Sequence, residues 1–215
     1  MAEPRVLQDI LRDLHRLGDF PAKPEGYQPN ETHHRWPIVL YRTDYNVGSE
    51  NKWEALITKV RSELVNTINE AAVPYESDGE STATDADKAK YEKQAKNLLE
   101  LLDFHAISDA ATLDGVSHDK LREVYKLFLE QENFTHRITR QRPFFVADTE
   151  VLGDDLKWIK CLDMPYDDDS DPEYLGWMKM VTDGIVELYS QLSSLAMYEL
   201  APETIGGMHL EIWEP

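Results

Sequence analysis

The run of residues 35–45, RWPIVLYRTDY, constrains the fold of this chain more than any other stretch. β-Branched and aromatic side chains dominate its first half, which is typical of a strand that packs into a core. Because side chains alternate between the two faces of a strand, Trp36, Ile38 and Leu40 share one face and the intervening positions share the other. Apolar groups on both faces require cover on both sides, so we expect an interior strand.

The two ends of this strand have different chemistry. Pro37 has no N–H to donate to a ladder, so we expect pairing to begin after it. The far end turns polar at Arg42 and Asp44. A site could form there, but a strand end does not by itself create one. The simpler interpretation, which we favour, is that both side chains reach solvent as the strand leaves the core.

Apolar residues at helical spacing predict several amphipathic helices. We expect them over residues 4–17, 49–72, 88–102 and 175–195, with one more after Ser117. Ser49 and Ser117 are expected N-caps. Alternating apolar residues predict further strands over 104–109, 143–152 and 158–164, and residues 209–213 could add a small edge strand. The short link around Gly153 predicts an antiparallel hairpin.

These elements predict an α+β fold, in which several amphipathic helices cover a small, mainly antiparallel sheet of about three to five strands. A ferredoxin-like arrangement is one option. We expect an N-terminal helix and connector at 1–34, a single domain at 35–200 and a C-terminal tail at 201–215. Residues 74–87 are rich in Ser, Thr, Asp and Glu and predict a flexible acidic insertion in that domain.

The charge balance limits the classes of partner. Lys and Arg total 22 against 41 Asp and Glu, a formal net charge of −19. Such a field repels phosphate backbones and anionic lipids, so we expect no nucleic acid and no membrane as partner. A basic protein surface or a small molecule remains open. The sequence shows neither a secretory signal nor an apolar run long enough to span a bilayer, so the expected compartment is the cytosol.

The common catalytic and cofactor motifs do not occur in this sequence. It contains no phosphate-binding Gly-rich loop, no nucleophile elbow and no His-Glu-x-x-His, so we expect no cofactor and no metal. The acidic run from Asp167 to Glu173 is not an EF-hand, because the sixth and twelfth positions hold Pro172 and Met178. A solvated loop is the expected alternative. Cys161 lies inside a predicted strand and is expected to be a buried, inert thiol.

Weak catalytic candidates lie late in strands or in the Asp-Gly turn. If strand ends converge, their carboxylates could have separated pKa values and perform acid–base chemistry. A structural ion network around the arginine, or plain exposure, is the outcome we favour. Antiparallel neighbours end on opposite edges of a sheet, so not all of these residues can meet. The candidates are Arg42, Asp44, Asp109, Asp114 and Asp148, with Asp163 in a similar position on the next strand.

Three stretches resemble the landmarks of a widespread, uncharacterised family of filamentous-fungal (ascomycete) proteins. They are the RW-x-IVLYRT-x-Y segment from Arg35, the TLDG-x-S segment from Thr112 and the GWMK segment from Gly176. The resemblance covers most of residues 35–198, although Pro37 stands where we expect Gly. It implies a source group and domain limits, but the family carries no established activity to transfer.

Two functions are compatible with these observations. The first, slightly preferred, is a non-catalytic binding or regulatory module, which the acidity and the amphipathic first helix favour. The second is a small cofactor-independent enzyme that acts on a fungal metabolite by Asp or His acid–base chemistry near Arg42. The enzyme predicts a cavity lined by Trp, Tyr and Phe with convergent polar groups.

Overall fold

The computed structural model describes residues 4–15, 33–73, 84–132, 134, 142–164, 174–205, 208–209 and 211–215. The expected connector before residue 33, most of the acidic insertion and the acidic loop at 165–173 lie outside the described residues. In the described residues, no helix is long and apolar enough to cross a membrane.

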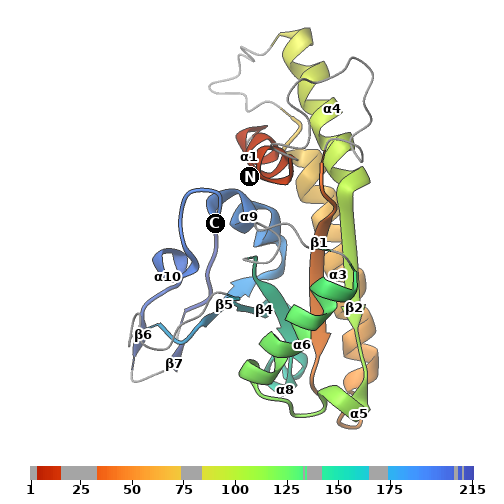
Figure 1. The fold of residues 1–215 in the computed structure, drawn as a ribbon, viewed down its shortest axis with the longest axis vertical. Helices are drawn as coiled ribbons and strands as arrows, with labels where there is room; N and C mark the ends of the chain where they lie inside the picture. The colour runs from red at the N-terminus through yellow and green to blue at the C-terminus, as the bar shows by residue number, and fades with distance from the viewer. Residues whose placement is uncertain are drawn as a thin grey trace.

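A five-stranded sheet of order β2-β1-β3-β4-β5 forms the centre of the molecule (Figure 1). β1 is parallel to both of its neighbours, whereas β4 is antiparallel to both of its own. The α+β class is confirmed, and the sheet is evenly mixed rather than mainly antiparallel. It is not ferredoxin-like, because there a third strand splits each βαβ unit and here β1 and β2 are direct parallel neighbours. The strands are β1 Trp36–Arg42, β2 Leu102–Ile107, β3 Phe144–Ala147, β4 Trp158–Leu162 and β5 Trp177–Val181.

Helices cover both faces of the sheet, with α6 in front of it and α3 behind it in Figure 1. A small second sheet, β6 Thr204–Ile205 with β7 Met208–His209, lies near the C-terminal part of the chain. The described helices are α1 Pro4–Leu14, α3 Ser49–Glu70, α4 Asp85–Leu101, α5 Ala110–Leu113, α6 His118–Gln131, α8 Thr149–Gly153, the 3-10 turn η1 Thr182–Gly184, α9 Ile185–Gln191 and α10 Met197–Leu200.

The alternation of β1 divides the hydrophobic core in two. Trp36, Ile38 and Leu40 belong to the larger cluster, which side chains from α1, α3, α4 and α9 complete. Val39 and Tyr41 belong to the smaller cluster under α6. Every residue of β1 is buried, so the predicted interior strand with cover on both faces is confirmed.

The expectation that β1 pairs only after Pro37 holds for one neighbouring strand and not for the other. The β1–β2 ladder already begins at Trp36, opposite Leu102, whereas the β1–β3 ladder begins at Leu40. The Pro37 carbonyl accepts a 3.5 Å hydrogen bond from the Tyr189 hydroxyl, away from β2. The missing N–H of Pro37 therefore removes no bond from the β1–β2 ladder, and the expectation is correct only on the β3 side.

The long helix expected over residues 175–195 is wrong. The segment forms strand β5, the turn η1 and the short helix α9. Met178 and Met180 are buried while Trp177 and Lys179 are half-buried, which is the alternation of a strand. Pairing with β4 along all five residues supplies the backbone hydrogen bonds that a helix would otherwise have to make. Gly184 then separates the strand from α9.

The strand expected over residues 143–152 ends at Ala147. Asp148 then caps α8, because its Oδ1 accepts hydrogen bonds of 3.1 Å from the backbone N–H groups of Glu150 and Val151. β3 and β4 still form the predicted antiparallel pair, so the hairpin is confirmed although a helical turn lies in its connection.

The predicted helix starts are partly correct. Ser117 caps α6, as expected, by accepting a hydrogen bond from the N–H of Lys120. Ser49 is not the cap of α3, because Gly48 takes that position with a φ of 91° and Ser49 is the first helical residue. α4 begins at Asp85, three residues earlier than expected, behind a Thr84 capping box.

The tail contributes to the edge of the large sheet through one residue. Trp213 forms a parallel bridge with Met180 of β5. Its N–H donates to the carbonyl of Lys179 at 2.8 Å, and the N–H of Val181 donates to the Trp213 carbonyl at 3.1 Å. The edge position expected for residues 209–213 is thus correct at Trp213, whereas His209 pairs within the small sheet.

Candidate functional site

A groove of about 730 Å³ opens between α1, the last turn of α3, the η1–α9 segment and residues 214–215. Figure 1 shows how this region brings the two ends of the chain together near α1 and α9. The groove is lined by four segments that are far apart in the sequence: Arg5, Val6, Asp9, Thr67, Glu70, Val181, Asp183, Glu187, Ser190, Gln191, Ser194, Glu214 and Pro215.

The lining is strongly acidic. Five of these residues carry carboxylates, against the single base Arg5. The negative charge of Asp9 is compensated by two arginines: its Oδ2 lies 3.7 Å from Arg5 Nε, and its Oδ1 lies 3.0 Å from Arg12 Nη1. Asp9 also accepts a hydrogen bond from the Ser190 hydroxyl. Three other lining carboxylates have no ion-pair partner among the described residues, and together they leave the groove with a negative potential: Glu70, Asp183 and Glu214.

The end of α3 adds to this potential. Thr67 and Glu70 are in the last turn of this 22-residue helix, and that turn contains no basic residue. The C-terminus of a helix carries a partial negative charge, which favours cations and disfavours a carboxylate such as that of Glu70. A positively charged group in the groove would therefore be stabilised by the helix end as well as by the side chains.

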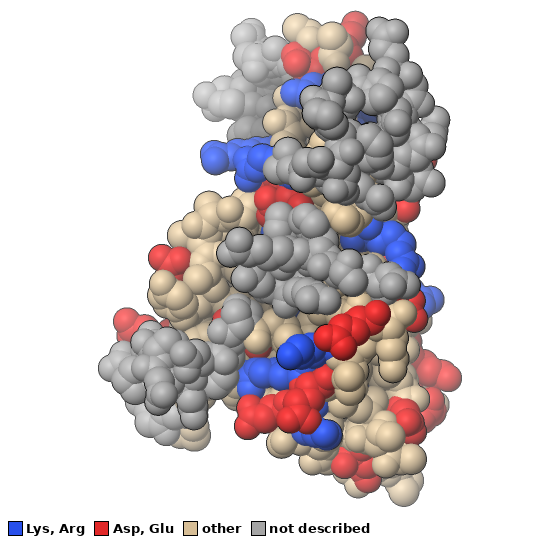
Figure 2. Space-filling model, in the orientation of Figure 1, with Lys and Arg blue, Asp and Glu red and all other residues tan. Residues whose placement is uncertain are grey.

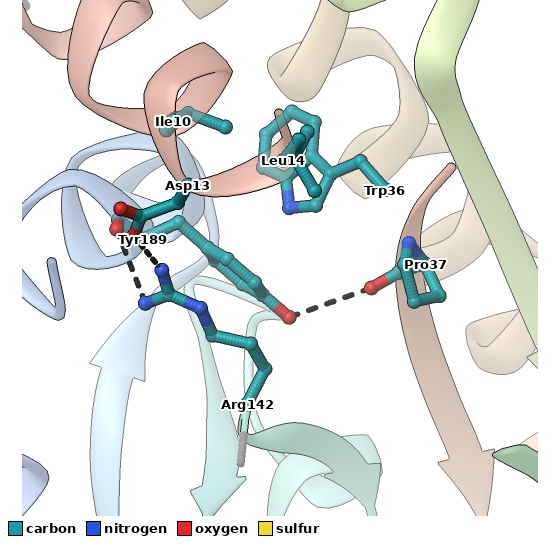
Figure 3. A pocket seen from close by; sticks show the side chains of 7 residues that line it. All are labelled: Ile10, Asp13, Leu14, Trp36, Pro37, Arg142 and Tyr189. Carbon is teal, nitrogen blue, oxygen red and sulfur yellow. Dashed lines mark hydrogen bonds and ion pairs between the residues drawn. The ribbon is translucent and has the colours of Figure 1, made fainter. Parts of the chain in front are cut away.

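A second cavity lies between α1, the start of β1 and Tyr189 of α9 and is much smaller than the groove (Figure 3). Its volume is about 10 Å³, which is room for about one water molecule. Arg142 forms an ion pair with Asp13 and lies over the ring of Tyr189. Trp36 Nε1 has no hydrogen-bond partner within the part of the chain that the structure describes. We regard this cavity as part of the structural anchor of α1, because it is too small for a ligand beyond water.

Arg42 and Asp44 do not reach solvent, so the favoured interpretation of this strand end is wrong. Arg42 is 3% exposed, donates through Nε to the Asp44 carbonyl at 2.8 Å and through Nη2 to Ser49 Oγ at 2.8 Å, and forms an ion pair with Glu50. Its guanidinium also lies over the ring of Tyr45. These contacts form a structural network around Arg42, which was the expected alternative to plain exposure.

Most of the carboxylates expected at the strand ends form hydrogen bonds that stabilise nearby turns and helix starts. Asp44 accepts hydrogen bonds from the backbone and side-chain amides of Asn46. Asp148 caps α8 and lies 2.6 Å from Lys160 Nζ. Asp109 caps α5, and Asp114 is exposed in the following turn. These roles occupy most of the carboxylates that acid–base chemistry would need.

The strand ends nevertheless converge as expected for parallel neighbours. The N–H of Thr43 donates to the Ala147 carbonyl at 3.0 Å, and the N–H of Gly115 donates to the Thr43 carbonyl at 3.0 Å. The ends of β1 and β3 and the Asp-Gly turn therefore lie at one edge of the sheet. Asp163 follows the antiparallel strand β4 and lies at the opposite edge.

Asp163 has an unusual environment for a carboxylate. Burial raises its pKa to about 6, against the opposing effects of a 3.2 Å hydrogen bond from the Tyr174 hydroxyl and the charge of Arg122. The same burial raises the pKa of Tyr174. Asp163 therefore titrates near neutral pH while Tyr174 stays protonated and donates to it, and the described residues place no second carboxylate against Asp163.

The acidic groove was missed by sequence reasoning. Its carboxylates come from α1, α3, η1, α9 and the tail, and no motif links these segments. The available signals were indirect: the net charge of −19 and an acidic residue at the end of the second expected helix. Among the described residues, no group of three or more His, Cys, Asp or Glu is placed to hold a metal ion.

Charge is distributed differently elsewhere. On the face shown in Figure 2, basic and acidic side chains are interspersed over the region of α6 and α8. Several are paired there, including Lys120 with Glu123 and Arg122 with Asp119. Mixed charges of this kind neutralise one another and do not favour either sign of partner, in contrast to the groove.

Comparisons with known proteins add no assignment to this geometry. No protein-family model, no curated protein and no solved structure matches the chain.

Proposed function

We propose that this protein is a non-catalytic binding module that takes a basic segment of a partner protein in the groove between α1, α3 and α9. The observation that carries the proposal is the acidic lining of a groove of about 730 Å³. Three of its carboxylates lack an ion-pair partner among the described residues, and a helix end of the same sign faces them. Lys or Arg side chains of a partner would supply the missing charge.

The composition of the groove favours a polypeptide over a small organic molecule. Pockets for small ligands are lined mostly by hydrophobic and aromatic side chains. The lining formed by the described residues contains no aromatic side chain, and its apolar members are Val6, Val181 and Pro215. A chain with several basic side chains can satisfy dispersed carboxylates better than a compact ligand with one charge.

The enzyme alternative has less support. It required Asp44, Asp109, Asp114 and Asp148 to be available for acid–base work beside Arg42. Three of these carboxylates are engaged in caps or turns, and Asp114 is exposed. A cytosolic location and membership of the fungal family remain part of the proposal, as the sequence predicts.

A charge-matched comparison tests the binding role. The probe is a fluorescent octalysine peptide, and its affinity is measured by anisotropy at low salt. The groove variant carries Glu70→Gln, Asp183→Asn and Glu214→Gln. The control variant carries Glu92→Gln, Glu100→Gln and Glu130→Gln, which are exposed residues outside the groove with the same change in net charge.

We expect the groove variant to bind about tenfold more weakly, since three exposed ion pairs at a few tenths to 1 kcal/mol each sum to this order. The control variant should change by about twofold or less, because distant charges are screened. Equal losses in the two variants would show that the peptide senses only net charge. Equal losses, or no binding by the wild type, would overturn the proposal.

A further inference from the structure

His209 of β7 packs against Trp177 of β5 and so connects the small sheet with the large one. It is 6% exposed, whereas its neighbour Met208 is 62% exposed. The imidazole lies edge-on to the indole of Trp177, with ring centroids 4.2 Å apart. Among the described residues, neither ring nitrogen has a hydrogen-bond partner of normal geometry, although at least one of them must carry a hydrogen. We call this buried position of the His209 ring against Trp177 the His209 seat. It suits a neutral imidazole, and it already leaves one ring N–H without a hydrogen-bond acceptor of normal geometry among the described residues.

The charges around this seat oppose protonation of the ring. Lys179 of β5 and Lys160 of β4 face it, together with Glu150 of α8, which pairs with both lysines. Burial is the largest effect and the lysines add to it, so the pKa of His209 is lowered. Glu150 and a backbone group of Trp177 act in the opposite direction, and the Trp177 contact falls short of a normal hydrogen bond.

A second histidine lies against the same indole and must be separated from His209 in any test. His118 of α6 contacts Trp177 edge-on at 5.4 Å. Burial, Lys160 and Arg122 lower its pKa, while Asp148 and Asp119 act in the opposite direction. His118 belongs to a helix of the main body, so its protonation would not act on the tail directly.

The tail that follows His209 forms one wall of the acidic groove. Trp213 is bound to the edge of β5 through two backbone hydrogen bonds, and Glu214 and Pro215 line the groove. Gly184 makes room for this wall, because a Cβ there would lie 3.0 Å from Trp213 Cζ3 and 3.4 Å from Pro215 Cδ. Trp213 is itself 7% exposed and belongs to the larger core cluster, so the tail is attached at two points, His209 and Trp213.

We propose that His209 is a pH-sensitive latch, which holds the C-terminal wall of the acidic groove in place while its ring is neutral and releases it on protonation. This inference rests on the proposed function for its consequence, because release of the wall removes Glu214 and Pro215 from the groove. The latch itself rests on the packing of His209 against Trp177 and on the short sequence separation between His209 and Trp213.

The direction of the effect follows from linkage. A released imidazole titrates near its ordinary pKa of about 6.5, and the seated ring binds its proton more weakly. The released state therefore gains a proton first as the pH falls below about 6.5. Attachment is complete above this pH and weakens below it. Asp163 titrates within the range from about pH 7.5 to 5.5, but it does not line the groove. Carboxylates and lysines of ordinary pKa stay charged over this range, so a basic ligand is unchanged.

The experiment measures two quantities on the full chain at about pH 7.5 and 5.5. Amide exchange gives protection factors for residues 204–215, with the amides of β1 as the internal reference. Anisotropy gives the affinity for the octalysine peptide. The test variant is His209→Phe, which keeps an aromatic ring on Trp177 but cannot titrate, and the matched control is His118→Phe.

For the wild type and for His118→Phe, we expect amide protection of residues 204–215 to fall about tenfold at the lower pH, because protonation of one imidazole favours the released state. The affinity for octalysine should fall about threefold. His209→Phe should show neither change, and β1 should stay protected throughout. Unchanged protection of 204–215 in the wild type would overturn the latch. So would a fall that persists in His209→Phe or disappears in His118→Phe.

The exchange data separate the two proposals. If octalysine fails to bind at either pH while exchange still depends on His209, the latch is supported and the binding role fails. If octalysine binds in the groove but exchange does not respond to pH, the binding role is supported and the latch fails. Exchange in the wild type needs no substitution, so a poorly folded variant would not remove the test.

Discussion

Lys160 and Lys179 lie directly opposite each other on the antiparallel strands β4 and β5, with their side chains on the same face of the sheet. Like charges in this arrangement repel, so the pair requires compensation. Glu150 of α8 supplies it by forming ion pairs with both lysines. Glu150, in the first turn of α8, thus stabilises the strand pair that follows it in the sequence.

Glu150→Gln should destabilise the fold by about 1 kcal/mol, because it leaves Lys160 with Asp148 and removes the ion pair of Lys179. The loss should shrink at high salt, where repulsion between the lysines is screened. Urea unfolding at two ionic strengths measures both effects. Glu92→Gln, an exposed change on α4, is the control, and an equal loss in that variant would contradict the role given to Glu150.

Asp163→Asn should stabilise the protein at neutral pH. The pKa of Asp163 is raised to about 6 in the folded state, so the folded state holds this proton more tightly than the unfolded state does. Stability is therefore lost as the pH rises from about 3.8 through 6, and the ionised form carries the full penalty above that window. The neutral amide of asparagine does not ionise, so it avoids the free-energy penalty of a buried carboxylate.

We expect Asp163→Asn to gain about 1–3 kcal/mol at pH 7.5 and to gain little at pH 4, where Asp163 is already protonated in the folded state. Urea unfolding at the two pH values measures the difference. Asp114→Asn, in an exposed turn, is the control for the change of residue type. A gain of the same size at both pH values would show that titration of Asp163 is not its cause.

Gly184→Ala should loosen the tail. The new Cβ would lie 3.0 Å from Trp213 Cζ3 and 3.2 Å from Val181 Cγ2, so Trp213 would have to shift. We expect a loss of about 1–2 kcal/mol, typical of overpacking, together with faster amide exchange at residues 211–215. Gly153→Ala is a matched control, because a Cβ there meets nothing within 4 Å. Slow exchange at 211–215 in Gly184→Ala would mean that the wall tolerates the methyl group.

Asp13→Asn should detach α1 from the start of β3. Asp13 and Arg142 form a largely buried ion pair, and loss of one partner leaves the other charge buried. Such losses cost about 3–5 kcal/mol when burial is complete, and we expect about 2–3 kcal/mol here because both groups keep some exposure. Thermal unfolding measures the change. Arg12→Gln, on the exposed face of α1, should cost less than about 1 kcal/mol.

Some parts of this fold were predictable because their causes are local. The alternation of residues 36–41 determines which side chains enter each core, and the structure divides them in the predicted way. Ser117 is a sufficient signal for the start of α6, since a capping hydroxyl needs only the next three residues. The hairpin of β3 and β4 was predictable from the short separation of two apolar runs.

Other parts depended on partners that are distant in the sequence. Residues 177–181 have apolar side chains compatible with a helix, and only pairing with β4 makes them a strand. Arg42 was expected in solvent, and only the fold of α3 against β1 brings Ser49 and Glu50 to it. Parallel pairing of β1 with β2 required two intervening helices, whose placement no local pattern determines.

The sequence alone therefore determined the strand-forming heart of the protein, its α+β class and its negative charge, because alternation, capping and net charge are properties of neighbouring residues or of composition. Tertiary structure alone decided where that charge gathers. The groove carboxylates come from α1, α3, η1, α9 and the tail, and the Trp177 seat of His209 joins β5 to β7. These groups meet only when the chain is folded, since contact between distant segments depends on how the helices and the sheet pack together.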